Sequence, residues 1–508
     1  MKGAILVCGT HSDAGKSVLA AGLCRWLSRE GVRVAPFKAQ NMALNSVVTR
    51  DGCEVGRSQA VQAAAARVEL EAAMNPILLK PSGSRHSQVV VMGHPYADAD
   101  ARSYQQLKAE LEPIVAGALR DLRGRFDIVV CEGAGSPAEI NLRDGDLVNM
   151  GLARAASLPV IVIADIDRGG VFASLLGTLA LLDAADQAHV VGFVINKFRG
   201  DPGILAPGLE RLEALTGRPV LGVLPYVEDL WMDVEDSLAL DGGRPEAPAA
   251  AGTLDVAVIR LRWISNFTDL DALGAEPGVR VRFTRSPADV ERADLVVVPG
   301  TKATVEDLDR LKVSGLDRAL SARAAAGGPI LGICGGYQLL GERIEDRVES
   351  GRGEVPGLAL LPVTTKFEPQ KLLRRRRGRC DWLVTPVGGY EIRHGRVRFE
   401  ETAVPLLIAD DGEREGCRKG PVIGFSWHGA LEHDEFRRAL LSWVSDRRGL
   451  SFIPGQTPFA AVREARLDAL GDLVAENIDT ERLAALIESG PPLDLPTITT
   501  EVRACCAS

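Results

Sequence analysis

Short apolar runs alternate with helix-like stretches along residues 1–235. The runs are rich in β-branched residues, which is typical of strands buried on both faces of a parallel sheet. They predict strands at 3–8, 32–37, 126–131, 159–164, 190–196 and 220–224, with helices at 16–29, 103–123 and 172–185. This order of elements predicts a doubly wound α/β domain.

A second α/β pattern begins at residue 254, with strands expected at 255–259, 279–284, 295–298, 330–333 and 422–426. Before it, the composition shifts to Gly, Pro and Ala, which indicates a linker. After residue 446 the pattern is mostly helical, with helices expected at 461–473 and 480–489. We therefore expect two doubly wound α/β domains at 1–235 and 253–445, a linker at 236–252 and a helical C-terminal tail at 446–508.

The composition is that of an ordinary globular protein. With 46% hydrophobic and 25% charged residues among 508, it excludes disordered and collagen-like chains. A net charge of −9 argues against nucleic-acid binding through bulk electrostatics. No apolar run reaches the ~20 residues that span a bilayer, and no signal-peptide pattern is present, so we expect a cytoplasmic protein with no membrane partner. Nine scattered cysteines without a CxxC pair favour buried thiols over disulfides or zinc ligands.

A run of four arginines, Arg374 to Arg377, stands out in the second domain. We interpret it as a solvated loop, and a surface for a polyanionic partner is the alternative. No internal repeat or low-complexity segment changes the fold prediction.

Residues 9–17, Gly-Thr-His-Ser-Asp-Ala-Gly-Lys-Ser, lie between a predicted strand and a predicted helix. Backbone N–H groups of such a loop, together with the helix N-terminus, cradle phosphate oxygens. Lys16 then reaches the β- and γ-phosphates, and the Ser17 hydroxyl is a ligand for Mg²⁺. We expect ATP to contact Gly9, Thr10, Asp13, Gly15, Lys16 and Ser17. The glycine spacing resembles that of dethiobiotin synthetase and its relatives, whereas His11 replaces the second lysine of partitioning-type ATPases.

Further polar residues end the predicted strands, at the edge where parallel sheets bind ligands. Glu132 follows a β-branched run and is the expected Mg²⁺ ligand besides Ser17. Asp165 and Asp167 end the next strand and either contact metal or substrate or form a turn. Asn196 ends a later strand. In the superfamily of dethiobiotin synthetase and the partitioning-type ATPases, which this part of the sequence resembles, an Asn at such a position often binds the edge of the adenine base. The alternative is that Asn196 is simply the last residue of the strand.

Residues 332–336, Gly-Ile-Cys-Gly-Gly, follow an apolar strand and precede a helix. This is the arrangement of a nucleophile elbow with Cys in place of Ser. Cys334 is therefore the candidate nucleophile, because a helix N-terminus and a nearby His favour its thiolate. The N–H of Gly335 is a natural oxyanion donor, and a second donor is expected from loop 299–302, at Gly300.

His428 is the best placed of the histidines to act as the base, because it follows the predicted strand 422–426. His394 and His433 are better explained as structural residues. Class I glutamine amidotransferases usually carry a Glu two residues after the catalytic His, and Ala430 stands at that position. The sequence thus predicts a Cys–His dyad whose His is oriented by a group that the sequence does not identify.

Several long segments resemble the cobyric acid synthase family: residues 36–46 (Pro-Phe-Lys-Ala-Gln-Asn-Met-Ala-Leu-Asn-Ser), 132–142, 165–172, 196–201, 389–392 and 428–429. The resemblance runs from residue 1 into the helical tail. It implies a P-loop NTPase-like domain followed by a flavodoxin-like class I glutaminase. It also implies Cys334 as nucleophile and His428 as its partner, with Asn41, Asp165 and Asp167 as possible contacts to substrate or metal.

The reaction that this resemblance implies is amidation of the b, d, e and g carboxylates of adenosylcobyrinic acid a,c-diamide, with glutamine as nitrogen source and ATP and Mg²⁺ as cofactors. Acyl phosphates are the implied intermediates. Residues 425–427, Phe-Ser-Trp, depart from the Tyr-Leu type sequence usual before the family's His. One alternative is the sister enzyme that makes the a,c-diamide, against which residues 41–45 argue. Another is a partitioning-type ATPase with an inactive glutaminase-like domain. The order of amidations, the ammonia route, the residues that grip the corrin and the oligomeric state stay open.

Overall fold

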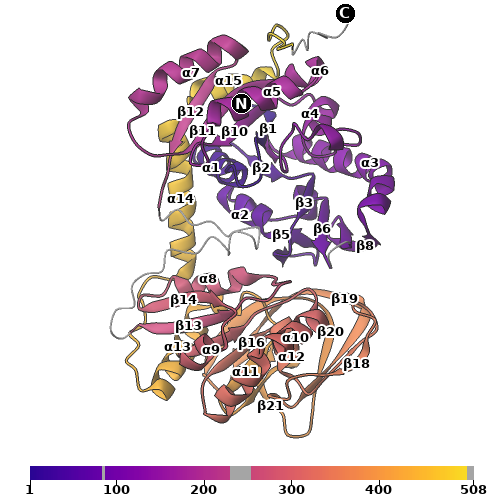
Figure 1. The fold of residues 1–508 in the computed structure, drawn as a ribbon, viewed down its shortest axis with the longest axis vertical. Coiled ribbons are helices and arrows are strands. Elements are labelled where there is room, and N and C mark those ends of the chain that lie inside the picture. The colour runs from indigo at the N-terminus through magenta and orange to yellow at the C-terminus, as the bar shows by residue number, and fades with distance from the viewer. Residues whose placement is uncertain (83–85, 229–252, 500–508) are drawn as a thin grey trace, which may run out of the picture.

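The computed structural model describes residues 1–82, 86–228 and 253–499, and these form two lobes stacked along the long axis of the molecule (Figure 1). The upper lobe in that view holds the first α/β domain, and the lower lobe holds the second. The linker predicted at 236–252 lies outside the described residues. Across the described part of the chain, no helix combines the length and apolar character needed to cross a bilayer.

A parallel six-stranded sheet forms the centre of the first domain, in the order β12-β11-β10-β1-β9-β2. Its strands are β1 (Gly3–Gly9), β2 (Val34–Phe37), β9 (Ile128–Glu132), β10 (Val160–Asp165), β11 (Val190–Phe198) and β12 (Val220–Pro225). Each falls on a predicted apolar run, because a strand covered on both faces is apolar throughout. The chain order reverses beside β1, which is where doubly wound sheets bind their ligands. The doubly wound α/β prediction is confirmed for this domain.

Helices cover both faces of this sheet. They are α1 (Lys16–Arg29), α3 (Ala101–Arg125), α4 (Met150–Ala156), α5 (Val171–Leu181), α6 (Ala184–Gln187) and α7 (Pro202–Thr216). Alternate residues of β1 point to opposite faces, so that Leu6 packs with residues of α3 to α5 while Ile5 packs with α1. The sheet is therefore buried between two helical layers.

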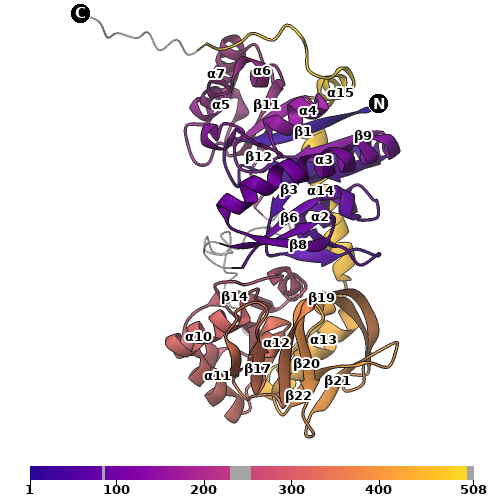
Figure 2. The same cartoon turned by 90° about the vertical axis from the view of Figure 1, so that its right-hand side faces the viewer.

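The helical prediction for the C-terminal segment is confirmed, and the structure places its helices on the first domain. They are α14 (Phe459–Asn477) and α15 (Thr480–Ser489). In Figure 1 α14 runs down the left side of the upper lobe, and in Figure 2 it lies behind that lobe. Buried Arg25 of α1 pairs with Glu464 and Asp468 of α14 at 2.6 and 2.9 Å. Leu470 and Val474 complete the apolar layer on the α1 side of the sheet.

Two small sheets that the apolar pattern did not predict lie on the side of the first domain nearest the second (Figures 1 and 2). One has the order β3-β6-β7-β8, and the other pairs β4 with β5. Their strands are β3 (Gln40–Met42), β4 (Ser46–Val48), β5 (Glu54–Gly56), β6 (Ile77–Pro81), β7 (Ser87–Val91) and β8 (His94–Ala99), and α2 (Arg57–Ala65) and the 3₁₀ turn η1 (Ala72–Met74) complete this region. These strands are short and carry polar residues, so they form no apolar run.

The second domain contains an eleven-stranded sheet whose first part, β14-β13-β15-β16-β23, is parallel, as the sequence predicts. These strands are β13 (Leu254–Ile259), β14 (Val279–Thr284), β15 (Leu295–Val298), β16 (Ile330–Ile333) and β23 (Val422–Phe425). The rest is a largely antiparallel extension made of β17 (Arg343–Asp346), β18 (Gly353–Pro356), β19 (Val363–Cys380), β20 (Thr385–Phe399), β21 (Val404–Ala409) and β22 (Arg414–Lys419). Its helices are α8 (Asp271–Gly274), α9 (Pro287–Arg292), α10 (Thr304–Ser314), α11 (Leu316–Ala325), α12 (Gly335–Leu340) and α13 (Asp434–Arg448).

The prediction of a solvated loop at Arg374 to Arg377 is wrong, because these residues lie within strand β19. Arg374 donates to Glu391 and Glu413 at 2.5 and 2.7 Å, and Arg376 also reaches Glu413, at 2.8 Å. Arg374 and Arg376 therefore pair with carboxylates of β20 and of the turn between β21 and β22. Ion pairs stabilise this part of β19, and apolar residues do not alternate with polar ones along it. The sequence pattern therefore does not predict a strand here.

Candidate functional site

The P-loop lies between β1 and α1, as predicted, at the carboxyl edge of the parallel sheet. Lys16 is 8% exposed, and its Nζ donates to the carbonyl oxygens of His11 and Gly135 at 3.0 and 3.1 Å. A side chain on Gly9 would press against Lys16, and one on Gly15 would lie 2.0 Å from Asn196 Nδ2. Gly15, whose φ is +108°, therefore leaves the space that Asn196 occupies, and Gly9 leaves room for Lys16.

A buried carboxylate stands beside this loop, where a metal ligand is expected. Ser17 Oγ donates to Glu132 Oε1 at 2.7 Å, and Lys38 Nζ approaches the same oxygen at 3.0 Å. Gln62 binds the other carboxylate oxygen. Burial opposes ionisation of Glu132, but Lys38, Ser17 and Gln62 outweigh it and hold its pKa below the usual value. A hydroxyl and a carboxylate 2.7 Å apart are hard oxygen ligands, and Mg²⁺ commonly takes its remaining ligands from phosphates and water.

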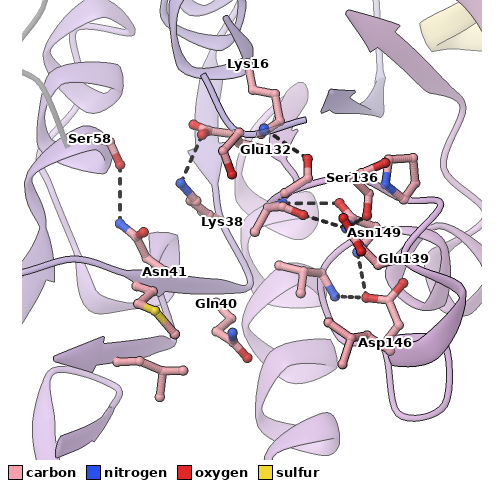
Figure 3. A pocket seen from close by; sticks show the side chains of 18 of the residues that line it. Lys16, Lys38, Gln40, Asn41, Ser58, Glu132, Ser136, Glu139, Asp146 and Asn149 are labelled. Carbon is pink, nitrogen blue, oxygen red and sulfur yellow. Dashed lines mark hydrogen bonds and ion pairs between the residues drawn. The ribbon is translucent and has the colours of Figure 1, made fainter. Parts of the chain in front are cut away.

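A cavity of about 1090 Å³ opens from the P-loop (Figure 3). Its lining includes Lys16, Glu132, Lys108, Arg143 and Asp146. Ligand cavities usually measure ~300–1,000 Å³, so this one lies at the upper end of that range. Loop 133–136 forms part of the wall and is braced by Asn149, as Figure 3 shows.

The other predicted residues of the first domain fall into two groups. Asn41 and Asn196 are buried and line the cavity. Asn41 donates to Gln59 and Ser58 of α2, and Asn196 donates to the Ala14 carbonyl. Asp13 also lines the cavity.

Thr10, Asp165 and Asp167 have other surroundings. The backbone N–H of Thr10 donates to the Ile163 carbonyl and extends the pairing of β1 with β10. Asp165 Oδ2 holds Lys197 Nζ at 2.7 Å, and Asp167 is an exposed partner of Arg199. Among the described residues, neither aspartate belongs to the cavity lining. Asp165 instead positions Lys197, which does line the cavity.

Cys334 occupies a strained turn between β16 and α12. Its φ of 50° and ψ of −107° are rare for a residue with a side chain, and its side chain is buried. A Cβ on Gly335 would lie 2.7 Å from Thr301, and one on Gly336 would lie 1.9 Å from the Val298 carbonyl. The flanking glycines therefore allow the turn that places Cys334 at the helix N-terminus.

His428 faces Cys334 from the end of β23, and the group that orients it is Asp269. Asp269 Oδ2 lies 2.7 Å from His428 Nδ1, and its Oδ1 accepts the Gly429 N–H at 2.8 Å. Burial alone would lower the pKa of His428, but Asp269 and Cys334 raise it to about 10. His428 is therefore protonated more readily than a free imidazole.

Sequence reasoning did not find Asp269, which lies 159 residues before His428 in the 3₁₀ turn η4 (Phe267–Leu270). In the structure the His of the predicted Cys–His dyad therefore has a carboxylate partner. The one available signal was indirect, since Ala430 at the usual carboxylate position required a replacement from elsewhere in the chain.

The pocket at Cys334 has a volume of about 40 Å³ and includes Gly335, Thr301 and Lys302. Gly300 itself packs against the His428 ring, since an added Cβ would lie 3.1 Å from Cε1. The residue of this loop that meets Gly335 is Thr301, whose backbone N lies 2.8 Å from the position of a Cβ on Gly335. Thr301 is therefore a further candidate, beside the predicted Gly300, for the second oxyanion donor. His394 lines the same pocket, whereas His433 packs against Gly388.

Comparison with known proteins matches both domains. A family model described as a CobQ/CobB/MinD/ParA nucleotide binding domain matches residues 5–239, and one described as a CobB/CobQ-like glutamine amidotransferase domain matches residues 255–436. The chain is 60% identical to the cobyric acid synthase of Frankia casuarinae, covering 98% of this chain and 99% of that protein. It is 56% identical to that of Rhodococcus jostii, covering 98% of each, and 57% identical to that of Saccharopolyspora erythraea, covering 97% and 96%.

Proposed function

The chain belongs to the cobyric acid synthase family, and from this premise we propose that it converts adenosylcobyrinic acid a,c-diamide to adenosylcobyric acid. It is a glutamine-hydrolysing amidotransferase of cobalamin biosynthesis with a nucleotide-binding domain before the glutaminase. The reaction amidates the b, d, e and g carboxylates. The observation that carries the proposal is the Cys334–His428–Asp269 constellation on the same chain as a large cavity at the P-loop. We place the reaction in the cytoplasm, where ATP and glutamine are supplied.

The glutaminase half releases ammonia. The Cys334 thiolate attacks the side-chain amide carbon of glutamine, and the N–H groups of Gly335 and Thr301 stabilise the oxyanion. The His428 imidazolium donates its proton to the leaving nitrogen, so ammonia departs and a thioester remains. Neutral His428 then takes a proton from water, which attacks the thioester and releases glutamate. Asp269 keeps the imidazole in the required tautomer throughout.

The synthetase half activates a carboxylate, which is a poor electrophile at neutral pH. The γ-phosphoryl group of ATP passes to a substrate carboxylate oxygen and gives an acyl phosphate and ADP. Lys16 now rests on two carbonyl oxygens and would exchange them for phosphate oxygens. Ser17 and Glu132 would hold Mg²⁺, which neutralises charge on the β- and γ-phosphates. Ammonia then attacks the acyl carbon, phosphate leaves with a proton from the nitrogen, and the amide forms.

The outer part of the cavity is the proposed corrinoid site. Lys108 and Arg143 line it and are the cations available for the substrate's carboxylates. Arg143 is held by Asp186 at 2.6 Å, which fixes its direction. Asn41 and Asn196 supply polar contacts nearer the P-loop.

Mass spectrometry of the products tests the proposed function. The full chain is incubated with adenosylcobyrinic acid a,c-diamide, ATP, Mg²⁺ and glutamine. We expect a series of products in which each of the b, d, e and g carboxyl groups becomes an amide, with ADP and glutamate released. Turnover of cobyrinic acid at positions a and c, with none of the a,c-diamide, would instead identify the sister reaction.

A further inference from the structure

Asn266 begins the turn that carries Asp269. It stands immediately before the 3₁₀ turn η4, and its carbonyl oxygen accepts the backbone N–H of Asp269 at 3.0 Å. Its φ of 50° and ψ of 37° lie in the left-handed region, which asparagine enters more readily than most residues with a side chain. The path of the backbone at Asn266 therefore sets where the turn places Asp269.

The alignment of Asp269 depends closely on that placement. One of its carboxylate oxygens lies 2.7 Å from His428 Nδ1, and the other accepts the Gly429 N–H at 2.8 Å. Donor–acceptor distances of such bonds span a range of only about 0.5 Å. A small shift of the turn would therefore separate the carboxylate from the imidazole that it orients.

The side chain of Asn266 is held by the first domain. Its Oδ1 accepts the backbone N–H of Ser46, in β4, at 2.8 Å. Both residues are buried, and a buried N–H needs an acceptor, so Ser46 and Asn266 hold each other in place. The residue that begins the turn of the glutaminase carboxylate is thus anchored on the synthetase domain.

A buried ion cluster fixes Ser46 in turn. Its Oγ donates to Glu54 Oε1 at 2.8 Å and accepts from Lys80 Nζ at 2.7 Å. Glu54 is fully buried and also pairs with Lys371 of the second domain at 2.5 Å. Desolvating these charges is costly, and apolar packing would stabilise the interface without that cost. We interpret the cluster as a device that sets the register of the two domains at Ser46.

We propose that Asn266 is a positioning residue for glutamine hydrolysis. It transmits the docking of the first domain, through Ser46, to the turn that aligns Asp269 with His428. The base is then fully oriented only while Ser46 occupies the side chain of Asn266. The inference rests on the proposed function and deepens it, because it makes the synthetase domain part of the machinery that orients the glutaminase base.

Two substitutions at Asn266 separate the role of its backbone from that of its side chain. Glycine keeps the left-handed conformation and removes the acceptor for Ser46, whereas aspartate keeps both. Glutamate release by the full-length protein is measured with glutamine, ATP and the a,c-diamide. We expect Asn266→Gly to lower kcat about 10- to 100-fold and to change KM for glutamine less than about twofold, because orientation is lost and binding is not. Asn266→Asp should recover most of the lost kcat.

A variant of the other domain keeps the test decisive if Asn266→Gly unfolds the glutaminase. Ser46→Pro removes the N–H donor itself and leaves the sequence of the second domain unchanged, and it should lower kcat in the same way. Amidation with ammonium salt bypasses the glutaminase and should continue in both variants, which checks the fold of the first domain. Val384→Gly is the matched control, because Val384 also has a positive φ, 53°, and is exposed on the second domain. It should leave every rate unchanged.

A double-mutant cycle shows whether Asn266 acts through Asp269. If it does, adding Asn266→Gly to Asp269→Asn should slow glutamate release by less than about twofold beyond Asp269→Asn alone. Fully multiplicative losses in the double variant, unchanged kcat in both Asn266→Gly and Ser46→Pro, or an Asn266→Asp variant as slow as Asn266→Gly would overturn the proposal. No glutamate release by the unmodified protein under these conditions would instead overturn the proposed function, so the two failures are distinguishable.

Discussion

His428 depends on groups that are distant in sequence and adjacent in space. Asp269 holds its Nδ1, Gly300 packs against its ring, and the Tyr390 ring lies 5.6 Å from it, centroid to centroid. The strand-to-loop geometry at 428 is local, and the sequence indicates it well. The carboxylate partner is a long-range contact that no spacing in the chain reveals, so the sequence predicts only that one is needed.

Replacing Asp269 by Asn should weaken glutamine hydrolysis far more than ammonia use. The variant keeps the shape but loses the charge that holds the tautomer, so glutamine-dependent turnover should fall by about 10²- to 10⁴-fold. Asp269 raises the pKa of His428 against burial, so its loss lowers that pKa and the imidazolium disappears at lower pH. The alkaline limb of kcat/KM for glutamine should move toward neutral pH. Steady-state glutamate release across pH measures both effects.

Ala430→Glu is the matched comparison for this prediction. Ala430 is 1% exposed, and Asp269 already occupies His428 Nδ1, so a glutamate at 430 should bring no gain in glutamine hydrolysis. Faster hydrolysis in Ala430→Glu, together with normal rates in Asp269→Asn, would show that Asp269 does not orient the base.

At the scale of elements, apolar runs predicted both parallel sheets and the P-loop and elbow at their carboxyl edges. The apolar pattern did not predict the small sheets β3-β6-β7-β8 and β4-β5 or the extension β17–β22. Their strands are either short or stabilised by ion pairs, so they form no apolar run. The sequence did predict α14 as a helix, but its docking on α1 depends on distant partners such as Arg25 with Asp468. Periodicity locates elements well, whereas contacts between remote elements leave little trace in a single sequence.

Leu470→Ala tests whether α14 belongs to the core of the first domain. Leu470 is 1% exposed within that core, so truncation should destabilise the protein by about 2–5 kcal/mol. Urea unfolding measures the free energy, and Leu493→Ala, at a fully exposed leucine, is the control. A loss no larger than that of the control would mean that α14 contributes nothing to this core.

The whole molecule joins two sites that are useful only together. Asn41 in the synthetase cavity contacts Ser58 and Gln59, and the preceding Arg57 reaches Glu432 at 3.0 Å. Glu432 lies four residues after His428, on the turn that follows it. We expect occupancy of the cavity to act on the glutaminase base through this short chain of contacts.

Glutamine hydrolysis should accordingly be slow in the free protein and faster when ATP and the corrinoid are bound. We expect a rise of about 5- to 150-fold, the usual range of coupling between sites, and a smaller rise in Arg57→Met, which lacks the link to Glu432. Glutamate release with and without the two substrates measures the rise. Equal and fast hydrolysis under both conditions would show that the glutaminase is fully assembled without the synthetase ligands.

The most direct test of the central claim, that one chain makes ammonia at Cys334 and uses it at the P-loop, compares two nitrogen sources in two variants. Amide formation from the a,c-diamide is measured with glutamine and with ammonium salt. Cys334→Ser should lose amidation with glutamine and keep it with ammonium, because the thiolate serves only ammonia release. Lys16→Ala should lose both, because phosphoryl transfer needs its charge. Glutamine-dependent amidation by Cys334→Ser, or near-normal ammonium-dependent amidation by Lys16→Ala, would contradict this division of labour.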